Sequence, residues 1–280
     1  MTRIRINSKL AYCFAILTVR WQTSTINVVG KIVAIANQKG GVGKTTTAVN
    51  LAAALAERGK RILLVDFDPQ GALTMCLGVN PSQLEETIYN VLIDPNVALT
   101  QVLLSPKPGI DLAPANIDLS GAEVELINEI GRERILRDKL SPLRTRYDYI
   151  FIDCPPSLGL LTINALAAAD GVLIPVQCQY LAFRGMQLLM RTIEKVQQRT
   201  NPKLKILGLL PTLYDIRTTH ATEVLEELRT SYKRLVIDIP IRFRISLADA
   251  TAGGQSILEF DSHSDAAEAF RKVAEVIENA

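Results

Sequence analysis

A glycine-rich run between two regular segments constrains the fold of this chain more than any other feature. The run is Lys39-Gly40-Gly41-Val42-Gly43-Lys44-Thr45-Thr46. An apolar segment at 32–36 precedes it, and a helical pattern at 45–58 follows directly. The order predicts a buried strand, a tight loop in which glycine adopts conformations that other residues avoid, and a helix. Such a unit is typical of a sheet flanked by helices.

The rest of the chain repeats this alternation of short apolar strands and longer helical patterns. We expect strands at 32–36, 61–67, 110–113, 149–153, 171–176, 205–210 and 235–238. We expect helices at 45–58, 119–140, 160–168, 185–198, 219–231 and 265–278. Strands that are apolar almost throughout are buried on both faces. The pattern therefore predicts an α/β fold, a doubly wound and mostly parallel sheet with helices on both faces, in one domain at 31–280.

Residues 1–30 do not share this pattern. Three basic residues at 3, 5 and 9 precede an apolar run at 10–19, as in a signal peptide, but no small-residue cleavage site follows. The run is also shorter than the roughly 20 apolar residues that span a bilayer. We interpret this segment as an N-terminal extension, either disordered or the product of an over-long start assignment.

Composition argues against several classes of protein. The formal net charge is only +2, so any polyanion site must be a local patch. The four cysteines form no C-x-x-C pair, which argues against metal or iron–sulfur ligation. A disulfide framework is implausible in a chain of this length, so we expect buried thiols in a reducing cytoplasm.

The glycine-rich run has the chemistry of a phosphate-binding loop. Glycines allow positive φ angles and a close approach of backbone N–H groups to phosphate, and the following helix start adds unpaired N–H groups. Lys44 is placed to reach the β- and γ-phosphates, and the Thr45 hydroxyl to ligate Mg²⁺. The standard pattern has glycine six residues before its lysine, where this chain has Gln38, and a second lysine stands at Lys39.

Two further strand ends supply carboxylates. The strand at 61–67 runs into Asp66-Phe67-Asp68-Pro69-Gln70, and the strand at 149–153 ends in Asp153. Asp153 has the position of a carboxylate that holds Mg²⁺ directly or through water. The alternative for Asp66 and Asp68 is that one of them only caps the following turn.

The loop with a leading lysine resembles the deviant Walker A loop of the ParA/MinD group of P-loop ATPases. The resemblance implies that ATP is the substrate and that Lys39 crosses to the ATP of a second subunit. It also implies that Lys44 binds phosphate in its own subunit, that Asp68 positions the attacking water and that Asp66 lies near the metal. The lack of an Asn-Lys-x-Asp sequence at 211–215 favours adenine over guanine, with the base framed near Pro211 and Pro240.

The ordered motifs at 39–46, 66–70, 153–162 and 175–179 together resemble the chromosomal Soj-like ParA proteins. In those proteins one arginine after a Tyr-Asp segment and one after an Ile-Pro segment bind DNA without sequence preference. Arg217 matches the first, and the second is open between Arg242 and Arg244. A basic helix face with Arg191, Lys195 and Arg199 is a further candidate, or simply a solvated face.

Other branches of the group fit less well. MinD-like proteins end in a basic amphipathic helix that binds membranes, whereas the polar side of the segment at 266–278 is acidic. We therefore expect no stable membrane anchor, and a cytoplasmic, nucleoid-associated protein.

The main hypothesis is a partition ATPase for chromosomes or plasmids that works with ATP and Mg²⁺. It would form an ATP-sandwich homodimer, bind DNA nonspecifically and hydrolyse ATP slowly under stimulation by a ParB-like activator. The alternatives are a related ATPase that positions a protein cargo, and a metabolic P-loop ligase or kinase.

Overall fold

The computed structural model describes residues 29–179 and 182–280, and residues 1–28 lie outside this range. Within it a seven-stranded sheet has the order β3-β4-β2-β5-β1-β6-β7. Its strands are β1 Lys31–Ile35, β2 Ile62–Asp66, β3 Leu104–Lys107, β4 Ile110–Ala113, β5 Tyr149–Asp153, β6 Gly171–Gln177 and β7 Lys205–Thr212. Every pairing is parallel except that between β3 and β4. The sequence-based prediction of a doubly wound, mostly parallel sheet is confirmed.

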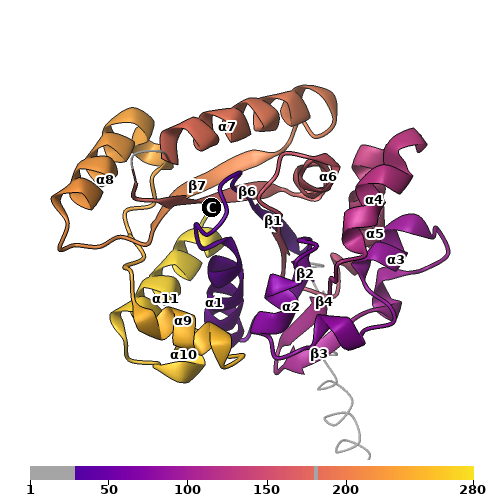
Figure 1. Ribbon diagram of the computed structural model, residues 1–280, viewed down its shortest axis with the longest axis horizontal. Helices are drawn as coiled ribbons and strands as arrows, with labels where there is room; N and C mark the ends of the chain where they lie inside the picture. The colour runs from indigo at the N-terminus through magenta and orange to yellow at the C-terminus, as the bar shows by residue number, and fades with distance from the viewer. Residues whose placement is uncertain (1–28, 180–181) are drawn as a thin grey trace, which may run out of the picture.

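Helices cover both faces of the sheet (Figure 1). Alternate residues of β1 separate the two cores, because Ile32 and Ala34 pack on one face and Val33 and Ile35 on the other. The first face is covered by α3 Ile88–Ile93, α4 Leu119–Glu125, α5 Ile135–Leu140, α6 Leu160–Ala168 and α7 Ala182–Arg199. The second is covered by α1 Lys44–Glu57, α2 Ala72–Cys76, α9 Ile245–Ala252, α10 Ile257–Phe260 and α11 Asp265–Glu278. Helix α8 Thr219–Tyr232 packs on Cys178 in a small third cluster, and its Leu228 belongs to the first core.

Two predicted elements are wrong. The single helix expected at 119–140 is divided into α4 and α5 by short 3₁₀ turns, and Gly131 in between has a φ of 75° that no helix interior allows. The strand expected at 235–238 makes one isolated parallel bridge, Leu209 to Val236, instead of a strand. A 3₁₀ turn over Lys233–Leu235 and Pro240 leave too little extended chain between them.

The parallel arrangement brings the carboxyl ends of β1, β2, β5, β6 and β7 to one edge of the sheet. The loops that carry the predicted site residues follow these strands. No helix among residues 29–179 and 182–280 is both long enough and apolar enough to cross a membrane.

Candidate active site

The loop between β1 and α1 has the conformation that its glycines allow. Gly41 and Gly43 have φ angles of 68° and 85°, and Gly43 is the N-cap of α1. The expectation that Gly40 also takes a positive φ is wrong, since it is not among the glycines with that conformation. A Cβ at Gly40 would lie 3.8 Å from the Cβ of Pro156, which is ordinary contact. Only the last two glycines are therefore required by backbone geometry.

Neighbouring strand ends hold this loop in place. The Asn37 side chain donates to the carbonyl of Pro175 at 2.6 Å and accepts the N–H of Lys39 at 3.0 Å. The hydroxyl of Thr212, at the end of β7, donates to the carbonyl of Val42 at 2.8 Å. These contacts fix the loop without using the N–H groups of Gly41 and Gly43.

Lys44 lies inside the loop. Its side chain is buried, and Nζ donates to the carbonyl of Lys39 at 3.3 Å. Burial lowers the pKa of the Lys44 amine, and the nearby carboxyl of Asp153 opposes that shift. A buried cation beside a loop of N–H groups is complementary to phosphate.

Thr45 and Asp153 form the polar pair next to the loop. The Thr45 hydroxyl donates to Oδ2 of Asp153 at 2.6 Å, and the other oxygen of this buried carboxyl, Oδ1, has no hydrogen-bond partner. Burial, followed by the proximity of Asp66, raises the pKa of Asp153 to about 8. A hydroxyl and a carboxylate oxygen without a partner are suitable ligands for Mg²⁺.

Asp66 lies on the strand beside Asp153, in direct register with it. Its carboxylate is engaged within its own segment, because Oδ2 accepts the N–H and the hydroxyl of Thr74 at 2.8 and 2.7 Å. The described residues contain no group of three or more His, Cys, Asp or Glu side chains that could hold a metal ion. The two hydrogen bonds from Thr74 make Asp66 a link between β2 and α2.

Asp68 begins the turn after β2. Its Oδ1 accepts the N–H of Gln70 at 3.0 Å, and its carbonyl accepts the N–H of Gly71 at 2.9 Å. The side chain is partly exposed, and its charge acts on both Lys44 and Asp153. Asp68 therefore caps a turn in this single chain while lying close to the phosphate loop.

The Lys39 side chain reaches the end of β6. Its Nζ donates to Oε1 of Gln177 at 2.8 Å and to Oε1 of Gln179 at 3.0 Å. The sequence marks these glutamines only as part of a motif and not as partners of a lysine. The two lysines of the loop thus have different surroundings, one buried and one at the rim.

A pocket of about 410 Å³ adjoins the loop on the side of β7. Its walls include Thr46, Thr212, Leu213, Ile241, Phe243 and Leu247. Leu213 and Ile241 directly follow Pro211-Thr212 and Pro240 in the chain, which is where the sequence predicts the nucleotide base. An apolar pocket beside a phosphate loop has the polarity that a nucleotide base requires.

The structure brings Arg217, Arg242 and Arg244 to one pocket of about 350 Å³. This pocket adjoins the apolar pocket beside the phosphate loop. Each guanidinium has an acidic neighbour. Arg217 donates to Asp215 at 2.9 and 2.8 Å, and Arg242 and Arg244 both contact Asp265 at the start of α11. The three arginines were separate candidates in the sequence and form one cluster in the fold.

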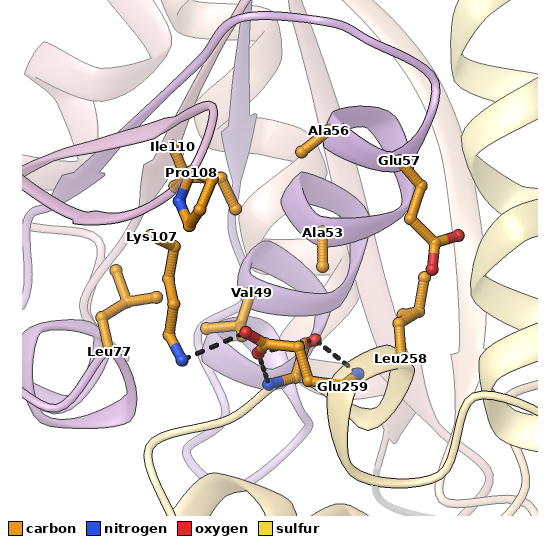
Figure 2. Close-up of a pocket in the computed structure, with 11 residues that line it drawn as sticks. Val49, Ala53, Ala56, Glu57, Leu77, Lys107, Pro108, Ile110, Leu258 and Glu259 are labelled. Atoms are coloured by element: carbon orange, nitrogen blue, oxygen red, sulfur yellow. Dashed lines mark hydrogen bonds and ion pairs between the residues drawn. The ribbon is translucent and has the colours of Figure 1, made fainter.

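A further pocket, of about 230 Å³, lies at the far half of α1 (Figure 2). Its walls are mostly apolar, from Val49, Ala53, Leu77 and Leu258, and Lys107 forms an ion pair with Glu259 at 3.1 Å. No residue of the phosphate loop lines it.

The fold and this site define a class of protein. A parallel sheet with a glycine-rich loop before α1, a buried lysine inside the loop and a Thr–Asp pair beside it is the architecture of a P-loop nucleoside triphosphatase.

Comparison with known proteins gives the family. A family model described as an AAA domain matches residues 30–206. The chain is 49% identical to the chromosome partitioning protein ParA of Myxococcus xanthus, over 86% of each chain. It is 45% identical to the sporulation initiation inhibitor protein Soj of Bacillus subtilis, over 89% of this chain and 98% of that one. The chain belongs to this ParA/Soj family of P-loop ATPases.

A solved structure is similarly close. It is described as cobyrinic acid a,c-diamide synthase from Mycobacterium smegmatis, with a bound ATP analogue and magnesium. It is 45% identical to this chain with a TM-score of 0.80, over 90% of this chain and 95% of that one. The likeness in fold and sequence therefore extends to a protein described as a synthase.

Proposed function

We propose that this chain, over residues 31–280, is a partition ATPase that uses ATP and Mg²⁺ to control nonspecific DNA binding. The observation that carries the proposal is the buried Asp153 carboxyl, which has one oxygen on Thr45 and one without a partner, directly beside the phosphate loop. The names and bound nucleotides of similar proteins support the same reading.

Different residues of the site would bind the phosphates, the Mg²⁺ ion and the attacking water. N–H groups at Gly41 to Thr46 and the Lys44 amine would bind the phosphates, and Thr45 and Asp153 would hold Mg²⁺, with Asp66 supporting them from the adjacent strand. Mg²⁺, when bound, supplies charge neutralisation of the phosphate oxygens. Asp68 would accept a hydrogen bond from the attacking water, while its Oδ1 accepts the N–H of Gln70 and holds the carboxylate in place.

Lys39 would act across a homodimer. Its amine lies at the rim of the loop, held by the carbonyl oxygens of two neutral side chains, Gln177 and Gln179. Neutral partners leave the full positive charge available to a phosphate of a second subunit. ATP would then favour the dimer because it is the shared ligand, and hydrolysis would release the two subunits.

DNA binding would use the cluster of Arg217, Arg242 and Arg244. Guanidinium groups bind backbone phosphates without reading bases, and a dimer presents two such clusters. This activity would place the protein in the cytoplasm on the nucleoid. A ParB-like partner would stimulate a slow basal ATPase, as the relationship to ParA and Soj suggests.

DNA retention on a column or filter tests the proposal. We expect retention with ATP, little with ADP, and loss of ATP-dependent retention for Lys39→Ala. Asp68→Ala should give dimers that persist in ATP because hydrolysis is slow. Equal retention under all three conditions would refute the ATP switch, and fast turnover by the Asp68 variant would remove that residue from its assigned role.

Two alternatives have distinct signatures. A cargo-positioning ATPase would show the same DNA switch, but a protein cluster and not a DNA-bound ParB-like protein would raise its turnover. A ligase, as the name of the M. smegmatis structure indicates for that protein, would remain monomeric in ATP and hydrolyse it only with an acceptor substrate. The cluster of Arg217, Arg242 and Arg244 favours a function that includes DNA binding over that of a ligase.

A further inference from the structure

The segment from Ile117 to Ile130 carries an unusual group of exposed apolar side chains. Ile117, Val124, Ile127 and Ile130 are exposed by 63%, 71%, 58% and 102%. They lie in α4 or in the chain just before and after it. Helix α4 contacts α3 and lies at the periphery of the molecule (Figure 1). Single exposed apolar residues are common, but several within so short a segment indicate a surface that another molecule covers. We call these four residues the α4 face.

The charges within the α4 face are acidic, and basic residues begin only after it, at Arg132 and Arg134. Between residues 117 and 131 the chain has four acidic residues and no lysine or arginine; the acids are Asp118, Glu123, Glu125 and Glu129. Glu125 accepts a hydrogen bond from the Tyr89 hydroxyl at 2.8 Å, and the described contacts include no ion pair for any of the four. Their negative charge is therefore available to a partner. A partner with apolar residues along one face and cations beside them matches this surface in both respects.

A hydrogen bond connects α4 to α6, the helix that follows the Asp153 loop. Oε1 of Glu123 accepts the N–H of Leu161, in the first turn of α6, at 3.2 Å. A Cβ on Gly159, the N-cap of that helix, would lie 2.3 Å from the same oxygen. The segment between Asp153 and α6 is only six residues long, so one short loop connects the helix that Glu123 contacts with the carboxylate of the site.

We propose that the α4 face is the docking surface for a basic, amphipathic segment of a partner protein, and that Glu123 transmits docking to the loop after Asp153. This inference rests on the proposed partner-stimulated ATPase and identifies where the partner acts. Glu123 is a positioning residue here, because it touches neither nucleotide nor water.

Binding can be tested on the full chain with a fluorescent helical peptide of leucine and lysine only. We expect the wild type to bind it. The Ile127→Ser, Ile130→Ser double variant, which removes the apolar contact without adding charge, should bind at least about tenfold more weakly. The control is Phe260→Ser, which removes an exposed apolar side chain from α10 and should bind as the wild type does. A peptide of leucine and glutamate should not bind.

Three results would overturn the docking proposal. They are equal binding by the double variant and the wild type, equal binding of the acidic peptide, and loss of ATP-dependent dimers in the double variant during sedimentation. The last would assign the α4 face to a second copy of this chain. Ile130→Ser alone should fold normally, because the Ile130 side chain is fully exposed.

The role of Glu123 is tested by ATP turnover with and without the leucine–lysine peptide. Glu123→Gln keeps an acceptor oxygen for Leu161, whereas Glu123→Ala removes it. We expect the peptide to raise turnover of the wild type and the glutamine variant, and to bind the alanine variant without raising its turnover. Stimulation of the alanine variant, or none of the wild type, would refute the transmission. Because basal turnover and DNA retention without peptide are measured separately, failure here is distinguishable from failure of the proposed ATPase.

Discussion

At the scale of single residues, Thr212 connects the last strand of the sheet to the phosphate loop. Its side chain is buried and donates to the carbonyl of Val42 at 2.8 Å. Thr212→Val keeps the volume but leaves that carbonyl without a donor. We expect the free energy of unfolding to fall by about 1–3 kcal/mol, measured by denaturant unfolding without nucleotide. Thr251→Val is the control, because that hydroxyl bonds within its own helix. An equal loss in the two variants would contradict the special role of Thr212.

Asp265, the first residue of α11, forms ion pairs with the arginine cluster. It contacts both Arg242 and Arg244, and these arginines hold its pKa below the ordinary value. A DNA phosphate must compete with this carboxylate. We therefore expect Asp265→Asn to raise DNA affinity in ATP by roughly two- to tenfold, measured by fluorescence anisotropy.

The control for Asp265 is Asp138→Asn, which makes the same change in net charge on α5 and should leave DNA affinity nearly unchanged. Equal gains would show that total charge, and not the local ion pairs, sets the affinity.

At the scale of elements, the phosphate loop shows which glycines its shape requires. Gly43 has a φ of 85° at the N-cap of α1, where an alanine is strained by about 1–2 kcal/mol. Gly40 lacks a positive φ and has no close neighbour. We expect Gly43→Ala to lower the free energy of unfolding by that amount and Gly40→Ala to change it by less than about 0.5 kcal/mol, measured without nucleotide. A reversed order would contradict this account of the loop.

The same scale explains which elements the sequence predicts well. β5 and α6 are found at the predicted residues, because a fully apolar strand and a continuous helical pattern are local signals. The helix predicted at 119–140 fails because its apolar period continues past Gly131, whose positive φ interrupts it. β3 has Pro106 and only four residues, so no local pattern indicates it, and its pairing with β4 depends on the fold.

At the scale of the whole molecule, two arginine clusters in a dimer determine how DNA binding depends on salt. The slope of log affinity against log salt is about −0.9 for each phosphate contact. Removal of Arg217, Arg242 or Arg244 by alanine should therefore reduce the slope by about 1 per subunit and about 2 in the dimer. Titrations of the ATP-bound protein at several salt concentrations measure this. An unchanged slope for all three variants would exclude the cluster as the DNA site.

The sequence by itself determined the fold class, the phosphate loop and the family, because each depends on residues that are near one another in the chain. The spacing of Gly41, Gly43, Lys44 and Thr45 is one such local pattern, and the apolar strand before Asp153 is another.

Only the tertiary structure decided which distant groups meet. It pairs Thr45 with Asp153, Lys39 with Gln177, Arg244 with Asp265, and Glu123 with the start of α6. The order of strands and the packing of helices fix these contacts. Strand order depends on the burial of whole faces, which no local sequence pattern records.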